Sequence, residues 1–200
     1  MSDNGSSENG YWDGQAASFD DEPDHGLLDP AVRGAWADLL LPLLPGNSAR
    51  IADIGCGTGT LSVLLAGAGH RVSGVDFAPR MVEAATAKAR DAGVTATFRR
   101  GDAQRPPLPA NAFDVVLCRH VLWALPDPVD ALRSWTRLLS PGGMLLLVEG
   151  SWLTGAGITG AECSRLVLQV RRSAELLALT DPTLWGRTIT DERFLVLSRQ

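Results

Sequence analysis

The chain has 200 residues, of which 45% are hydrophobic and 20% are charged, and its formal net charge is −5. This length suits one domain that buries a substantial core. The negative charge argues against a nucleic-acid partner, because such binding needs Lys and Arg side chains that neutralise phosphates. The sequence has no apolar run long enough to cross a membrane, and it begins with a polar segment unlike a signal peptide. We therefore expect a cytoplasmic protein without a membrane partner.

The N-terminal part of the chain divides into a tail and a lid. Residues 1–10 are small and polar with nothing to bury, which predicts a disordered tail. Residues 11–200 are predicted to form a single domain. In residues 11–45, spaced aromatic residues begin at Tyr11, and a helical pattern begins at Pro30. A segment of this kind can fold over a ligand, so we expect residues 11–45 to form a lid and a helix.

Between residues 50 and 150, short apolar runs alternate with helical patterns. The runs are RIADI, RVSGV, TATFRR, FDVVLC and MLLLVE, separated by segments such as PRMVEAATAKARDAG. This alternation is typical of βαβ units, in which a parallel sheet is covered by helices on both faces. We expect this stretch to form the core that binds a cofactor.

The last part of the chain, residues 151–200, follows a different pattern. Residues 159–178 have a helical pattern, and LLALT and RFLVLS are two further strand candidates. The connection between these two is too short for a crossover helix, which predicts an antiparallel hairpin at the sheet edge. The predicted fold class is therefore α/β. It is a Rossmann-like, doubly wound, mostly parallel seven-stranded sheet with a C-terminal antiparallel hairpin and an N-terminal helical lid.

A glycine-rich loop follows the first apolar run, in the sequence RIADIGCGTGT. Gly55, Gly57 and Gly59 lack Cβ atoms, so the backbone can approach a ligand closely and adopt positive φ angles. The helix that follows presents unpaired N–H groups at its start. Asp76 ends the second apolar run, where a carboxylate can accept hydrogen bonds from both hydroxyls of a ribose. The spacing is GxGxG, with Thr60 in place of the last glycine of the dinucleotide pattern, so an adenosine-type ligand is favoured.

Taken together, these segments resemble the class I S-adenosylmethionine-dependent methyltransferases of the small-molecule type. IADIGCGTG resembles their first motif, VDFAPRMVEAA the second, GDAQRPPLPANAFDVVLCRHVLWAL the third and fourth, and LLSPGGMLLLVE the fifth. The motifs follow the family's order over residues 50–150. The resemblance implies an enzyme with S-adenosyl-L-methionine as cofactor and S-adenosyl-L-homocysteine as product. It implies transfer of a methyl group to an O, N or C atom of a small-molecule acceptor, with specialised metabolism as one setting.

The resemblance also implies which residues hold the cofactor. Asp53 would orient the loop or meet the methionine amine through water, and Gly55–Gly57 would pass under the methionine part. Arg119 would offer its backbone to the methionine amine, and Tyr11 would lie over the cofactor. The full set is Tyr11, Asp53, Gly55, Cys56, Gly57, Asp76, Phe77, Met81, Gly101, Asp102, Ala103 and Arg119.

The nucleoside half of the cofactor would be held by the next two strand ends. In this resemblance, Asp76 would hold the ribose hydroxyls, and Phe77 and Met81 would pack on the adenine face. Asp102 would accept from the adenine amino group, beside the backbone N–H of Ala103. No metal is expected, because the spacings of the three cysteines match no zinc motif.

Several residues are candidates for the acceptor side. A general base is needed only where the acceptor must lose a proton early, and His120, after the fourth apolar run, could take it. The alternative for His120 is packing and a backbone hydrogen bond. His25 in the lid is a second candidate, with a surface histidine as its alternative. Trp123 and Trp152 either stack on a planar acceptor or pack in the core. Glu149 is either a polar pocket residue or a solvated acid at a strand end.

Two other functions remain open from the sequence. One is a non-catalytic cofactor-binding module of the same fold, and the other is a nicotinamide oxidoreductase, against which the missing third glycine argues. The acceptor is not determined, because acceptor contacts come from variable loops. Related enzymes often carry longer insertions between residues 150 and 180. Their absence here favours an open pocket, or one completed by a second subunit, and we expect a monomer or homodimer.

Overall fold

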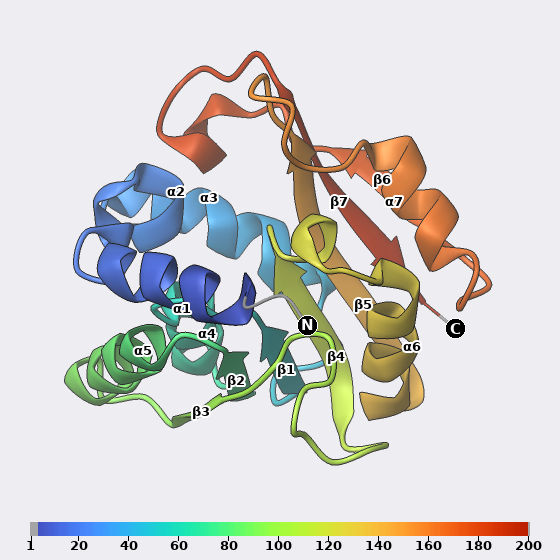
Figure 1. Ribbon diagram of the computed structural model, residues 1–200. Helices are drawn as coiled ribbons and strands as arrows, with labels where there is room; N and C mark the ends of the chain where they lie inside the picture. The colour runs from blue at the N-terminus through green and yellow to red at the C-terminus, as the bar shows by residue number, and fades with distance from the viewer. Residues whose placement is uncertain (1–3, 200) are drawn as a thin grey trace.

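The computed structural model describes residues 4–199 and shows one continuous sheet. Within these residues the sheet has seven strands in the order β3-β2-β1-β4-β5-β7-β6 (Figure 1). Neighbouring strands from β3 to β5 are parallel, and β7 lies antiparallel between β5 and β6. The bounds are β1 (Arg50–Ile54), β2 (Arg71–Asp76), β3 (Ala96–Arg100), β4 (Phe113–Arg119), β5 (Leu139–Ser151), β6 (Glu175–Ala178) and β7 (Glu192–Ser198). The predicted α/β fold class with an antiparallel C-terminal edge is confirmed.

Helices cover both faces of the sheet and enclose two separate cores. Helices α3 and α4 contribute to one core, with α5 packed beside α4, while α6 and α7 contribute to the other. Along β1, Ile51 enters the first core and Ala52 and Ile54 enter the second, as expected for a strand buried on both faces. The bounds are α3 (Pro30–Leu40), α4 (Thr60–Gly67), α5 (Pro79–Asp91), α6 (Pro128–Leu138) and α7 (Gly160–Val167).

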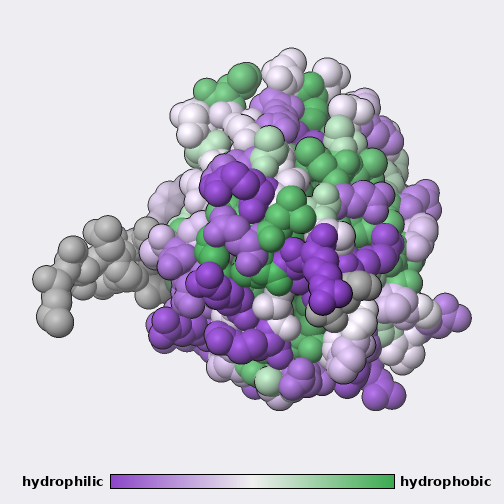
Figure 2. All heavy atoms as spheres, turned by 90° about the vertical axis from the view of Figure 1, so that its right-hand side faces the viewer, coloured by the Kyte–Doolittle hydropathy of each residue, from purple (hydrophilic) through white to green (hydrophobic). Residues whose placement is uncertain are grey.

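Helix α6 shows how the sequence pattern selects the buried face. Ala131, Leu132, Trp135 and Leu138 are buried against the sheet, at spacings that share one side of a helix. Asp127 caps the helix by accepting from the backbone N–H of Asp130 at 2.9 Å. Figure 2, which faces the side of the molecule with α6 and α7, shows hydrophilic and hydrophobic residues intermixed on the outside. Within residues 4–199, no helix is long and apolar enough to span a membrane.

The N-terminal segment contains a helix that the sequence did not predict. Helix α1 (Asn4–Gln15) begins inside the tail predicted over residues 1–10, whose disorder stays a prediction; residues 1–3 lie outside the described residues. The helix is held from its C-terminal half, because the Asp13 carboxylate accepts from the backbone N–H of Arg80 at 3.0 Å. That acceptor satisfies a free donor at the start of α5. Composition alone could not reveal this tertiary contact.

The C-terminal segment contains a shorter helix than predicted. The helical pattern over residues 159–178 gives only α7, and residues 175–178 form strand β6 instead. The buried guanidinium of Arg171 explains the break, because it donates to the Gly143 carbonyl at 2.7 Å and to the Ser198 hydroxyl at 3.1 Å. These bonds tie the turn after α7 to strands β5 and β7. The antiparallel pairing of β6 with β7 is as predicted.

Candidate active site

The glycine loop joins β1 to α4 at the carboxyl edge of the sheet. Gly55, Gly57 and Gly59 all have positive φ angles, of 70°, 54° and 76°. A Cβ atom on Gly55 would collide with the Val121 side chain, and one on Gly59 would lie 2.7 Å from Cβ of Ala85. Glycine is therefore required for both backbone conformation and close approach. The loop is held by the Val75 carbonyl, which accepts from the backbone N–H groups of Gly55 and Cys56.

Asp76 at the end of β2 lies directly against this loop. One carboxylate oxygen accepts from the backbone N–H of Gly57 at 2.9 Å, and the other accepts from that of Ala78 at 2.9 Å. Burial raises the pKa of Asp76, while these backbone donors oppose that shift. The loop and the strand-end acid, far apart in the sequence, thus form one polar cradle.

Asp53 links the strand before the glycine loop to the helix after it. It is buried and accepts from the Ser62 hydroxyl at 2.6 Å, which fixes the first turns of α4 relative to β1. Burial raises the pKa of Asp53 to about 6. This contact agrees with an orienting role, and its predicted contact with a cofactor amine stays a prediction.

The lid segment closes over the loop from the N-terminal side. It consists of the 3₁₀ helix η1 (Phe19–Asp21) and the short helix α2 (Pro23–Gly26). Asp20 is the anchor, since its carboxylate accepts from the Thr58 hydroxyl at 2.5 Å and pairs with the Lys88 ammonium at 2.7 Å. The Phe19 ring covers Gly57 and stacks on the His25 ring, with centroids 4.3 Å apart.

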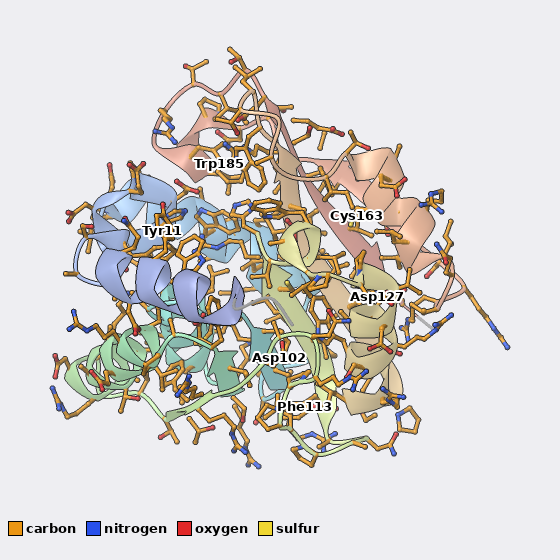
Figure 3. The ribbon with its side chains drawn as sticks, in the orientation of Figure 1. Tyr11, Asp102, Phe113, Asp127, Cys163 and Trp185 are labelled. Atoms are coloured by element: carbon orange, nitrogen blue, oxygen red, sulfur yellow. The ribbon has the colours of Figure 1, made fainter. Side chains whose placement is uncertain are left out.

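Tyr11, which the sequence resemblance places over the cofactor, stays a prediction in that role. Tyr11 lies on α1, is 60% exposed, and packs edge-on against Trp12 (Figure 3). The aromatic residue that contacts the glycine loop itself is Phe19. Two features of the sequence could have identified Phe19. It is one of the spaced aromatic residues of the lid, and it precedes Asp20, which pairs with Lys88 in α5.

The contact between Phe19 and Gly57 gives a prediction. A Cβ atom on Gly57 would lie 3.2 Å from Cε1 of Phe19, and its φ of 54° is strained for any other residue. We expect Gly57→Ala to lower the free energy of unfolding by about 1–2 kcal/mol. Denaturant titration measures this loss, and the same substitution in a Phe19→Ala background separates its causes. A smaller loss there assigns part of it to the ring, whereas an equal loss contradicts the contact.

Arg119 at the end of β4 holds the lid with its side chain. Its guanidinium donates to the backbone carbonyl of Asp24 in α2 and lies over the Trp36 ring, 5.3 Å from the centroid. The sequence resemblance considers only its backbone, and that backbone role stays a prediction. The side-chain contact is a tertiary feature that the sequence did not reveal.

The residues predicted around the nucleoside lie at or after the ends of β2 and β3. Their exposure differs. Phe77 is half-buried, whereas Met81 is 2% exposed and packed in α5. Gly101 donates from its backbone to the Asp76 carbonyl at 2.9 Å. Asp102 is exposed and accepts from the backbone N–H of Gln104 (Figure 3). Ala103 is buried, with its carbonyl accepting from the Trp135 indole.

An aromatic cluster forms the other side of the site, beyond β4 and β5. The His120 ring lies 5.3 Å from the Trp152 ring and 6.1 Å from the Trp185 ring, centroid to centroid. The Trp123 ring lies 5.5 Å from that of Trp152, and its indole N–H donates to the His120 carbonyl at 3.1 Å. The Arg193 guanidinium lies over both Trp152 and Trp185. The structure thus brings together three predicted residues and adds Trp185 and Arg193, which the sequence did not indicate.

Glu149 is not the solvated acid at a strand end that was one of its two predicted alternatives, and its role as a polar pocket residue stays a prediction. It is fully buried, and one carboxylate oxygen accepts from the backbone N–H groups of Val121 and Leu122 at 3.0 and 2.7 Å. Burial raises the pKa of Glu149 to about 8. The residue is a positioning group that fixes the turn after β4, on which His120 lies.

His25 lies in the lid rather than on the protein surface. Its ring stacks on Phe19, and its pKa is lowered by burial and by the nearby Arg119 guanidinium. Its carboxylate neighbour Asp24 is 3.8 Å away. His25 therefore packs within the lid, against Phe19.

A parallel sheet with a bare glycine loop and a strand-end acid at its carboxyl edge defines a protein that binds a nucleotide-type cofactor. Residues 52–147 match the family described as a methyltransferase domain. The domain formed by residues 52–147 belongs to the class I S-adenosylmethionine-dependent methyltransferases, as the sequence motifs predict, and S-adenosylmethionine is the cofactor of this family.

Relatives and solved structures agree with this assignment. A ubiquinone biosynthesis O-methyltransferase of Cereibacter sphaeroides is 38% identical over 109 residues, which cover 54% of this chain and 44% of that protein. One from Xanthomonas campestris pv. campestris is 33% identical over 144 residues, covering 70% and 55%. The chain thus spans about half the length of the curated relatives it matches.

Solved structures show the same fold at low identity. The cyclase SpnF has a TM-score of 0.72 at 20% identity, with 83% of this chain and 80% of that one covered. An S-adenosylmethionine-dependent methyltransferase from Mesorhizobium loti has a TM-score of 0.66 at 20% identity, covering 84% and 100%. These similarities establish the fold alone, which serves more than one reaction.

Proposed function

We propose that this protein binds S-adenosylmethionine in the cradle of the glycine loop and Asp76, and transfers its methyl group to a small molecule. The observation that carries the proposal is the hydrogen bond from the Gly57 backbone to the Asp76 carboxylate. It joins a bare backbone to a buried acid at the carboxyl edge of a parallel sheet, where cofactors of this kind bind.

The residues present fit such a cofactor. Asp76 offers carboxylate oxygens to ribose hydroxyls, and the bare backbone at Gly57 lies beside this carboxylate, with the Phe19 ring next to it. Phe19 and Arg119 hold the lid against the site, because the first covers Gly57 and the second ties the lid to β4. When bound, S-adenosylmethionine supplies a methyl group that is already activated, so alignment of the reactants provides much of the acceleration.

An oxygen acceptor is favoured over nitrogen or carbon. The similar proteins of Cereibacter and Xanthomonas are O-methyltransferases by name. The aromatic cluster beside the cradle offers stacking surfaces for a small molecule, since Trp123 is 37% exposed and Trp152 is half-buried. Action on a small molecule in the cytoplasm, as a monomer or homodimer and without nucleic acid, stays a prediction.

Calorimetry with S-adenosylhomocysteine tests the binding half of this proposal. We expect micromolar binding, and the absence of binding would refute the proposal. Transfer of label from methyl-labelled S-adenosylmethionine to a small-molecule extract tests catalysis. Binding without transfer would support the non-catalytic module, and a fluorescence change on adding NADH would support the nicotinamide oxidoreductase instead.

A further inference from the structure

Strand β6 is the outermost strand at one edge of the sheet. Within the described part of the chain it pairs only with β7, and all four of its residues are exposed. The backbone N–H of Leu179, just after the strand, donates to the Arg193 carbonyl at 2.8 Å. Hydrogen bonding alternates along an antiparallel pair, so Leu177 also faces β7. The N–H and C=O groups of Leu176 and Ala178 therefore point away from the sheet.

This edge lacks the protection that open strand edges usually have. An open edge can pair with a strand of another molecule, and proteins commonly prevent this with charged residues. The opposite edge of the sheet is protected in this way, because β3 carries the exposed residues Arg99 and Arg100. Strand β6 instead exposes Leu176 by 47% and Leu177 by 45%. Its edge is therefore suited to a partner strand.

A groove of about 600 Å³ lies between β6 and α3. Leu177 lines it from the strand, and the small residues Ala31, Gly34 and Ala35 line it from the helix. No heavy atom lies within 4 Å of the place where a Cβ atom on Gly34 would be. The groove therefore has room beside Leu177 for an apolar side chain from another molecule.

The geometry of this edge fits a second copy of the same chain. Two β6 strands can pair antiparallel about a two-fold axis, because the same surface then meets itself. The outward groups align when the axis passes at Leu177. Leu176 of each copy then forms a hydrogen-bonded pair with Ala178 of the other. The two Leu177 side chains lie directly opposite each other, over the groove.

The charges at the two ends of β6 are complementary in this pairing. Arg172 precedes Leu177 and Asp181 follows it at nearly the same distance along the chain. Antiparallel pairing therefore brings Arg172 of each copy next to Asp181 of the other. Both residues are exposed, and neither has an ion pair within the described part of the chain. Glu175, the acid on β6 itself, pairs with Arg199 of its own chain at 3.6 Å.

The neighbouring registers fit less well. An axis at Ala178 would place Glu175 opposite Asp181 of the other copy, and two acids directly opposite each other are destabilising. An axis at Leu176 would place Leu177 opposite Glu175, so an apolar side chain would meet an acid. An axis between two residues would align the outward groups of one copy with groups of the other that already face β7. The charges and the backbone therefore favour the same register.

We propose that the protein forms a homodimer in which β6 pairs antiparallel with β6 of a second copy, so that one sheet runs through both molecules. The two-fold axis passes at Leu177, and ion pairs between Arg172 and Asp181 close both ends of the interface. This inference does not depend on the methyl transfer reaction and goes beyond the function proposed above.

Sedimentation velocity of the full chain, over low to high micromolar concentrations, tests for the dimer. We expect the wild-type protein to have twice the mass of one chain. Ala178→Pro removes a backbone N–H that faces away from β7, a position at which an edge strand tolerates proline. We expect it to raise the dissociation constant of the dimer about tenfold or more. Leu177→Lys should do the same, because it places two like charges at the axis.

Exchange of the end charges tests the register. Arg172→Asp should weaken the dimer because two acids then meet at each end, and Asp181→Arg should weaken it because two arginines meet. The variant with both substitutions restores opposite charges and should dimerise more tightly than either single variant. The matched control is Leu153→Lys, at an exposed leucine in the loop after β5, which should keep the wild-type dissociation constant.

Circular dichroism and thermal unfolding establish that each variant is folded, and Leu177→Lys serves alone if Ala178→Pro does not fold. A wild-type protein that stays monomeric over the whole concentration range overturns the proposal. A dissociation constant that stays within about threefold of wild type in the folded variants of β6 also overturns it, because the interface then lies elsewhere. A double charge variant that dimerises no better than the single variants overturns the register.

Discussion

Replacement of Asp76 by alanine is expected to weaken binding of S-adenosylhomocysteine by about 1–3 kcal/mol, or roughly 5- to 150-fold. The variant loses the carboxylate proposed to hold the ribose. It also leaves the backbone N–H groups of Gly57 and Ala78 without their acceptor, so the glycine loop loses a fixed conformation. Calorimetry at one pH and salt concentration measures the change.

Two comparisons separate these causes. Asp76→Asn keeps one acceptor oxygen for the backbone and should lose less affinity than the alanine variant. The 2′-deoxy analogue of the ligand lacks one hydroxyl, so its affinity should fall less in the variant than that of the parent compound. Asp91→Ala, an exposed acid at the end of α5, is the control for lost charge. Unchanged affinity in Asp76→Ala would remove the ribose from this position.

Replacement of Glu149 by glutamine is expected to stabilise the protein increasingly as pH rises. The pKa of Glu149 is raised from 4.5 to about 8, so the folded state holds a proton that the unfolded state releases between these values. Stability from this group is fully present below pH 4.5 and is lost as pH rises toward 8. The loss amounts to roughly 4–5 kcal/mol in a group this deeply buried. Glutamine cannot ionise, and its carbonyl can still accept from Val121 and Leu122.

The measurement is the free energy of unfolding at pH 5, 6.5 and 8 for both proteins. The difference in favour of Glu149→Gln should be small at pH 5 and largest at pH 8. Glu149→Leu provides the contrast, because it leaves two backbone N–H groups unpaired and should destabilise the protein at every pH. A difference between wild type and Glu149→Gln that does not change with pH would contradict the raised pKa.

The sequence by itself determined the α/β fold and the part of the candidate site formed by the glycine loop and Asp76. Apolar runs such as residues 50–54 identified the central parallel strands, because helices on both faces of the sheet bury those strands. The glycines at 55, 57 and 59 and the acid at 76 identified the cradle. A positive φ favours glycine, and the ends of neighbouring parallel strands meet at one edge. These features are local, or follow from the strand order.

Only the tertiary structure decided how the lid and the acceptor side are built. Phe19 rather than Tyr11 covers the loop, because the Asp20 carboxylate meets Thr58 and Lys88 from other elements. Glu149 is buried and accepts a hydrogen bond from the turn after β4. Residues 159–178 form both α7 and β6 rather than one helix. The partners of these side chains lie in other elements of the fold, so the periodicity and spacing of the sequence do not predict such contacts. The physical reason is that burial and hydrogen bonding are satisfied in space, whereas patterns report only the neighbours along the chain.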